Sequence, residues 1–273
     1  MTLKEGIKIH SQLADFESRL ELSNGTISAS LNTHTLNTHF DDAFVPQEPW
    51  RSPTQEEIDL IAGSYPSRNS NLELSIIKIP EEIIDGFRQV NYALIQENGL
   101  SDEMHDSIEY QQLFQRLTDH LKVYGKPEDM KVYGFTKGLP DLTTTSHEFK
   151  GKRYIGLHLD NWDGLSIDKR HLATNRISIN VGTQERYFLY INLTAQFMYQ
   201  MLKDDKTETD NISEGRFVGD HFMEKFPEYP VIKCKVNPGE AYIANTENII
   251  HDGCTIGTGK TDYTFVVRGY FGL

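Results

Sequence analysis

A succession of short β-type segments, with no helices alternating between them, is the feature that most constrains how this chain folds. The segments are MKVYGFTK (130–137), RYIGLHLDN (153–161), RISINVG (176–182), RYFLYINL (186–193), VIKCKV (231–236), EAYIANT (240–246) and DYTFVVRGYF (262–271). Strands that are not linked by crossover helices form antiparallel sandwiches or barrels, so this architecture is predicted. GTQE (182–185) predicts a turn, and the two segments that flank it are expected to form a hairpin.

The first 125 residues carry helical signals. Thr54 and Glu57 form a T-x-x-E capping box at the start of one helix, and Pro80 opens a second. A broad apolar stripe marks a third. The predicted helices are 54–62, 81–98 and 107–124, and the predicted strands of this region are 25–30 and 72–79.

We expect one compact unit with two parts. Residues 1–125 are interpreted as an N-terminal elaboration whose helices buttress a sheet, and residues 126–273 as the β-rich core. Residues 195–230 separate two strands by a connection long enough to suggest a function. Its first part, AQFMYQML, predicts an amphipathic helix, and its polar middle predicts a mobile stretch. We interpret 195–230 as a lid over the mouth of the barrel.

The charge balance excludes several classes of partner. The chain has 273 residues with 27 basic and 40 acidic side chains, which gives a formal net charge of −13. Nucleic acids and anionic membranes attract basic surfaces, so neither is an expected partner. The N-terminus lacks the apolar region of a signal peptide, no run is long enough for a membrane helix, and two cysteines form no disulfide framework. We expect a soluble, cytoplasmic protein.

RYIGLHLDN contains the strongest candidate for chemistry. If this segment is a strand, His158 and Asp160 lie on the same face. They supply two-thirds of a two-histidine, one-carboxylate site for non-haem Fe(II), and His251 is placed to supply the third ligand. A buried hydrogen-bonded pair is the structural alternative. A second His-x-Asp, His39-Phe40-Asp41, lies in a polar loop and is expected to face solvent.

Arg268 is the second candidate. It lies on one face of the predicted strand 262–271, within an otherwise apolar segment. A buried guanidinium requires an anion, and its planar fork suits a carboxylate. The anion is either an internal Asp or Glu or a carboxylate-bearing cosubstrate.

His158-x-Asp160, His251 and Arg268 together resemble the Fe(II)/2-oxoglutarate-dependent dioxygenases, as does PGEAYIANTENIIHDG (238–253). The resemblance covers about 130–273. It implies a mainly β fold with flanking helices, namely a double-stranded β-helix, or jelly roll, with an N-terminal α-helical elaboration. It also implies that His158, Asp160 and His251 bind Fe(II), that 2-oxoglutarate and O2 are cosubstrates, and that Arg268 binds the distal carboxylate of 2-oxoglutarate. Polar residues that could assist it are Ser178, Asn180 and Thr264, and the next cations in line are Arg186 and Arg176.

The expected substrate is a small molecule, such as an amino acid or a natural-product intermediate. Hydroxylation, desaturation or cyclisation is expected, because Asp160 occupies the position that halogenating relatives leave open for chloride. The alternatives are a cupin-fold isomerase or metal-dependent binding protein that does not use 2-oxoglutarate and, ranked lower, a hydroxylase of protein side chains. Cys254 is expected to pack in the core and not to bind metal. Candidate substrate contacts are Asn161, Trp162, Asp163, Arg186 and Tyr190; the oligomeric state is not predicted.

Overall fold

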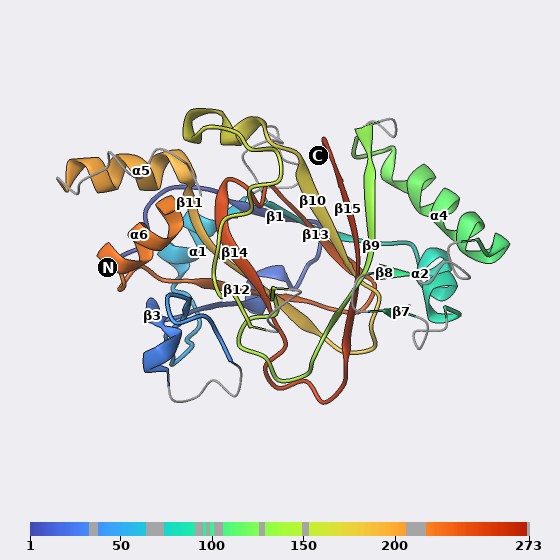
Figure 1. Cartoon of the computed structure of the whole chain (residues 1–273), viewed down its shortest axis with the longest axis horizontal. Helices are drawn as coiled ribbons and strands as arrows, with labels where there is room; N and C mark the ends of the chain where they lie inside the picture. The colour runs from blue at the N-terminus through green and yellow to red at the C-terminus, as the bar shows by residue number, and fades with distance from the viewer. Residues whose placement is uncertain are drawn as a thin grey trace.

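Two β-sheets form the body of the protein (Figure 1). The computed structural model describes residues 1–32, 38–63, 74–90, 95–96, 99–100, 106–125, 129–148, 153–205 and 217–271. The larger sheet has seven strands in the order β5 (Ala62–Gly63), β1 (Ile9–Ser11), β6 (Leu74–Lys78), β13 (Glu240–Ala244), β10 (Asn175–Asn180), β15 (Asp262–Gly269) and β9 (Lys131–Gly138). The smaller has four, in the order β14 (Ile249–Cys254), β11 (Arg186–Thr194), β12 (Ile232–Val236) and β2 (Leu20–Leu22).

Antiparallel pairing prevails, as the sequence predicts; β1 is the exception and runs parallel to β5 and β6. Two small ribbons pair β3 (Thr26–Ser28) with β4 (Phe44–Pro46) and β7 (Ile95–Gln96) with β8 (Gly99–Leu100). The α-helices are α1 (Gln55–Ile61), α2 (Glu81–Arg88), α4 (Ile108–Leu121), α5 (Ala195–Asp204) and α6 (Phe217–Lys225). Among the described helices, none is both long and apolar enough to cross a membrane.

The two sheets pack face to face. Phe188 of β11 stacks on Tyr242 of β13 with ring centroids 4.1 Å apart, and one hydrophobic cluster contains residues of both sheets. Alternate residues of the larger sheet point the other way into a second cluster. Ile177 and Phe265 pack there against Phe87 of α2 and Leu117 of α4. The arrangement is a β-sandwich, with α2 and α4 on the outer face of its larger sheet.

The structure confirms the residues at which the predicted helices begin. Thr54 and Glu57 make both hydrogen bonds of the capping box of α1, and the Ser107 side chain caps α4. The predicted helix 81–98 was too long, since α2 ends at Arg88 and Ile95–Gln96 is extended in β7. Residues 1–125 also supply strands to both sheets, among them β1, β6 and β2, so this half is not only a helical elaboration.

The predicted hairpin of 176–193 was wrong. β10 pairs with β13 and β15, whereas β11 pairs with β12 and β14 in the other sheet. The turn between them is held by Asn180, whose amide donates to the carbonyl oxygens of Gln184 and Val236. Alternation correctly predicts which residues face the interior, but it does not identify the neighbouring strand.

A β-bulge interrupts β9 where it pairs with β15. Val266 is paired with Gly134 and Val267 with Val132, so Tyr133 has no partner in the ladder. Gly134 has φ +83°, a conformation that favours glycine. Bulges redirect the side chains next to them, and the Tyr133 side chain lines the cavity described below.

Candidate metal centre and its cavity

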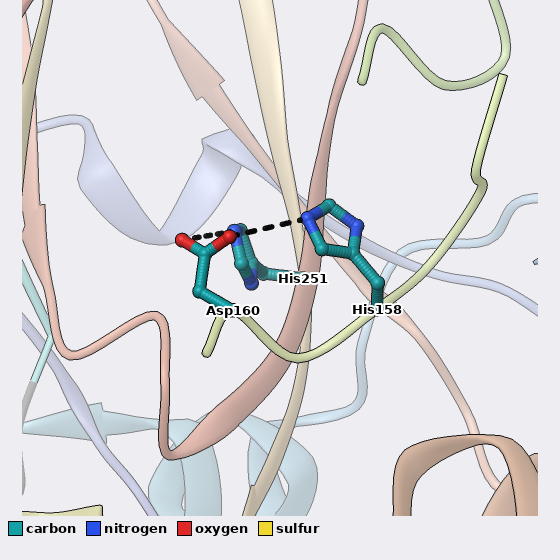
Figure 2. A group of neighbouring side chains, drawn as sticks. All are labelled: His158, Asp160 and His251. Atoms are coloured by element: carbon teal, nitrogen blue, oxygen red, sulfur yellow. Dashed lines mark ion pairs between the residues drawn. The ribbon is translucent and has the colours of Figure 1, made fainter. Parts of the chain in front are cut away.

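His158, Asp160 and His251 lie together between the sheets. Each offers one ligand atom, and these atoms lie within 4.8 Å of one another. Asp160 Oδ1 is 3.5 Å from His158 Nε2, and its Oδ2 is 3.7 Å from His251 Nε2. Figure 2 shows the three side chains pointing toward a common centre. The structure thus brings together the three residues predicted as ligands.

The local structure that achieves this differs from the prediction. Residues 153–161 do not form a strand; only isolated bridges occur, at Tyr154 and His158. Gly156 has φ +73°, and a Cβ there would lie 2.3 Å from the carbonyl oxygen of Phe44. His158 instead exchanges two backbone hydrogen bonds with His251, of 3.1 and 2.9 Å. His251 lies on β14, a strand that the sequence did not predict.

Both imidazoles are oriented by their Nδ1 atoms. His158 Nδ1 is 2.8 Å from the carbonyl oxygen of Gly156, and His251 Nδ1 is 3.3 Å from that of Ile249. When either ring is neutral, with Nδ1 protonated and donating, its lone pair is on Nε2, the atom that faces Asp160. Among the described residues, His251 Nε2 and Asp160 Oδ2 have no hydrogen-bond partner although both atoms are buried.

The charges also suit a metal ion. Burial lowers the pKa of His251 to about 3, so this ring is neutral near pH 7. Burial acts to raise the pKa of Asp160, but the neighbouring His158, His251 and Arg176 side chains outweigh burial and hold that pKa well below its usual value. A neutral imidazole and an ionised carboxylate are the forms that bind metals. Two histidines and one carboxylate with unpartnered atoms can therefore hold a divalent cation.

Asp252 supports this centre and was missed by the sequence analysis. Its Oδ1 accepts hydrogen bonds from the backbone amides of Thr145, Ser146 and Gly253, and its Oδ2 lies 3.7 Å from His158 Nδ1. A carboxylate beside the Nδ1 of a ligating histidine fixes the orientation of the ring. The only signal in the sequence is the adjacency of Asp252 to His251.

A cavity of about 690 Å³ opens onto the three residues. Strands of both sheets line it, so it lies inside the sandwich. Besides the candidate ligands, the lining contains two arginines, Arg176 and Arg186, and the aromatic residues Tyr133, Phe135, Trp162 and Tyr242. Pockets of this size take small molecules.

Arg268 was expected, from the resemblance, to bind the distal carboxylate of 2-oxoglutarate. It is not among the lining residues, and its Nη2 donates to Glu247 Oε1 at 2.8 Å. Asp163 Oδ1 lies 3.5 Å from the same nitrogen. Arg268 is therefore paired with internal carboxylates, which is the alternative that the sequence analysis left open.

Arg186, which the sequence analysis named after Arg268 as a candidate for binding 2-oxoglutarate, lines the cavity. Its Nε lies 3.6 Å from Asp262 Oδ2 and, within the described part of the chain, donates no hydrogen bond. A Cβ on Gly253 would lie 2.4 Å from Arg186 Nη2 and 2.5 Å from Thr145 Oγ1. Glycine at position 253 thus makes room for the guanidinium beside the candidate ligands.

The predicted assisting residues divide into two groups. Ser178 and Thr264 line the cavity. Asn180 does not; it holds the turn after β10.

The predicted substrate contacts divide in the same way, since Trp162 and Arg186 line the cavity but Asn161, Asp163 and Tyr190 do not. Tyr190 is fully buried. Asn161 Oδ1 accepts from Arg170, and Asp163 Oδ2 accepts from the backbone and hydroxyl of Thr174.

Arg170 organises the segment after the metal group. It lies in the 3-10 helix η5 (Ile167–Leu172), is fully buried, and donates to the carbonyl oxygens of Asp160 and Glu247. Glu247 Oε1 also accepts from the backbone amide of Asp163. Arg170 and Glu247 thereby join the 160–163 segment to the turn before β14. The sequence gives no sign of this, because its partners are mostly backbone atoms of distant segments.

Two further expectations can be compared with the structure. α5 forms as predicted, but α5 and α6 bury Met198 and Phe222 in the core, and none of the described residues of 195–230 lines the cavity. The polar middle of this insert, 206–216, lies outside the described residues. His39 was expected to face solvent; it is buried and bonded to Thr144 Oγ1 at 2.8 Å.

Comparisons with known proteins gave similarity to solved structures only. No family model matches the chain, and no curated protein matches it. The chain is similar to SnoK, a non-heme alpha ketoglutarate dependent carbocyclase from nogalamycin biosynthesis, with 13% identity, a TM-score of 0.40, and coverage of 75% of this chain and 81% of that chain. It is also similar to HygX from Streptomyces hygroscopicus with iron bound, with 12% identity, a TM-score of 0.40, and coverage of 80% and 87%. A third structure, the Kdo hydroxylase KdoO in complex with succinate and Fe(III), has 12% identity, a TM-score of 0.38, and coverage of 74% and 80%.

Proposed function

We propose that this chain is an Fe(II)- and 2-oxoglutarate-dependent oxygenase that acts on a small molecule. The observation that carries the proposal is the group of His158, Asp160 and His251, whose ligand atoms converge within 4.8 Å beside a cavity of about 690 Å³. Two histidines and one carboxylate are the ligand set of non-haem Fe(II) oxygenases, which leaves the remaining coordination positions for cosubstrates.

The residues of the cavity support distinct roles. His158, Asp160 and His251 would hold the iron, which supplies the oxidation chemistry when it is bound. Arg186 would bind the distal carboxylate of 2-oxoglutarate, because it is the cavity-lining arginine beside Gly253 and Thr145. Ser178 and Thr264 would offer hydroxyl groups to the same ligand. The surrounding sheets exclude water from the reacting groups.

The class of reaction follows from Asp160. Its carboxylate occupies a ligand position and adds negative charge, which disfavours a halide at the metal. The proposed outcome is hydroxylation, desaturation or cyclisation of the substrate. Chlorinated product formed by the unaltered enzyme in chloride buffer would contradict this proposal.

An anaerobic titration tests the function. Fe(II) and then 2-oxoglutarate are added without oxygen, and a visible metal-to-ligand charge-transfer band is expected. His251→Ala should abolish iron binding and the band while the circular dichroism spectrum is unchanged. His39→Ala serves as a matched control, because His39 also belongs to a His-x-Asp sequence but not to the metal group, and it should retain the band. Iron binding without any band on addition of 2-oxoglutarate would favour a cupin-fold metalloprotein of another class.

The role of Arg186 is tested in the same titration. Loss of a buried charge-assisted pair costs about 2–5 kcal/mol of binding, so Arg186→Met should raise the Kd for 2-oxoglutarate roughly 30-fold or more. Iron affinity should stay nearly the same. Arg268→Met, compared at a temperature at which both variants are folded, should change the Kd for 2-oxoglutarate much less. If Arg268→Met raises the Kd for 2-oxoglutarate more than Arg186→Met does, Arg268 and not Arg186 binds the distal carboxylate.

A further inference from the structure

Arg176 is a charged residue of the cavity that has no assigned role in binding the metal or 2-oxoglutarate. It lies on the inner face of β10, directly opposite Arg268 of β15. Its side chain is 24% exposed and lines the cavity. Within the part of the chain that the structure describes, its guanidinium makes no hydrogen bond, and its one ion pair is with Asp160, at 3.7 Å.

The neighbouring arginines have closer partners inside the protein than Arg176 has. Arg268 is paired with Glu247 at 2.8 Å, and Arg170 donates to carbonyl oxygens and to Asn161. Arg176 differs because its partner Asp160 is also a candidate metal ligand. The single negative charge of Asp160 cannot balance both a divalent cation and a guanidinium. Once metal is bound, the metal and Arg176 together carry more positive charge than Asp160 can balance, so this end of the cavity attracts a further anion.

Two aromatic side chains lie at the same end. Tyr133 and Trp162 line the cavity, with ring centroids 5.5 Å apart in an edge-to-face arrangement. They are 44% and 57% exposed, which is high for aromatic residues. Tyr133 is directed here by the bulge in β9, and Trp162 follows Asp160 by two residues. Their exposed rings offer a flat apolar surface to a ligand.

The cosubstrate is proposed to bind at the other end. Arg186 lies near Asp262, at the start of β15. Arg176 of β10 is opposite Arg268 in the strand register, near the end of β15. Six residues separate these positions along the strand, which corresponds to roughly 20 Å between the Cα atoms. At this separation an anion held by Arg176 does not compete with one held by Arg186, and the candidate ligand Asp160 lies 3.7 Å from Arg176.

We infer that the substrate is a small organic anion whose oxyanion group, a carboxylate or a phosphate, pairs with Arg176 and whose apolar body rests against Tyr133 and Trp162. This inference rests on the proposed oxygenase function, because it names the substrate class of the same site. The oxyanion is held beside the metal group, which places neighbouring carbon atoms of the substrate next to the iron.

The test uses matched small molecules. Arylalkyl carboxylic acids are compared with their own neutral amides and with phosphate esters of the same aryl group. Each is titrated into the anaerobic complex with Fe(II) and 2-oxoglutarate, and the shift of the charge-transfer band is recorded. Quenching of Trp162 fluorescence in a Trp50→Phe background gives a second readout, because the chain has only two tryptophans. An acid or phosphate should bind about tenfold or more tightly than its amide.

Two variants test whether Arg176 is the residue that binds the anion. Arg176→Gln should remove the preference for the anion, while the addition of Fe(II) and 2-oxoglutarate should still produce the charge-transfer band. Lys137→Gln changes another cation of the same cavity and should keep the preference. If no acid or phosphate binds more tightly than its amide, or if Arg176→Gln binds them equally well, the inference is overturned. The fluorescence titration is also run with Zn(II) alone, so a failure of the 2-oxoglutarate assignment is distinguished from a failure of anion binding.

Discussion

Arg268 and Glu247 form an ion pair that is almost completely removed from water, with side chains 5% and 0% exposed. Removing one partner from such a pair leaves an uncompensated buried charge, which costs about 3–5 kcal/mol. Arg268→Met should therefore lower the free energy of unfolding by about that amount, measured by urea denaturation. Adding Glu247→Leu should recover part of the loss. A variant Arg268→Met as stable as the parent protein would contradict the view that this arginine is structural.

Sequence reasoning at the residue scale succeeded where partners have a recognisable chemistry. The grouping of His158, Asp160 and His251 could be predicted because two histidines and one carboxylate form a ligand set that is characteristic of non-haem iron. Arg268 was assigned to an external carboxylate, because the sequence does not show that the side chain of Glu247 lies within 2.8 Å of it. Arg170 could not be found at all, since two of its hydrogen bonds are to backbone oxygens, which every residue has.

At the scale of elements, the bulge in β9 connects backbone conformation to the substrate end of the cavity. Gly134 has φ +83°, and a Cβ at this position would have no atom within 4 Å, so alanine there strains only the backbone. Gly134→Ala should cost about 1 kcal/mol of stability and shift Tyr133. Binding of the aryl acids should weaken, while the iron titration stays the same.

Gly257→Ala is the matched control for the bulge. Gly257 has φ +79° and equally open surroundings, but it lies in a turn after β14. It should lose similar stability and bind the aryl acids as the parent protein does. Equal binding by Gly134→Ala and Gly257→Ala would mean that the bulge does not position Tyr133.

Elements were predictable where local signals decide them. The capping residues Thr54 and Ser107 mark where α1 and α4 begin, because a cap acts within a few residues. Strand partners depend on the whole topology, and so the 176–193 hairpin was wrong. Residues 153–161 alternate as a strand does, but Gly156 has φ +73°, and the pairing there is reduced to isolated bridges.

For the whole molecule, metal binding and stability are linked. Buried atoms of His251, Asp160 and Asp252 have no hydrogen-bond partner among the described residues, and the first two face the candidate metal position. A ligand that binds only the folded state at 100 times its Kd adds about 2.7 kcal/mol of stability. Anaerobic Fe(II) should therefore raise the Tm, and the increase should grow with metal concentration. An equal increase for His251→Ala would show that the metal binds elsewhere.

The position of β15 has a consequence for biosynthesis. β15 follows every other described strand in the chain, yet in the sheet it lies between β10 and β9. While the ribosome is still translating this strand, β9 has no partner in the larger sheet, and the outer-face residues of that sheet lack part of their packing. Such unpaired edges favour aggregation or capture by a chaperone. The cavity gains one of its walls only when β15 has left the ribosome and entered the gap, because Asp262, Thr264 and Val266 of this strand line it.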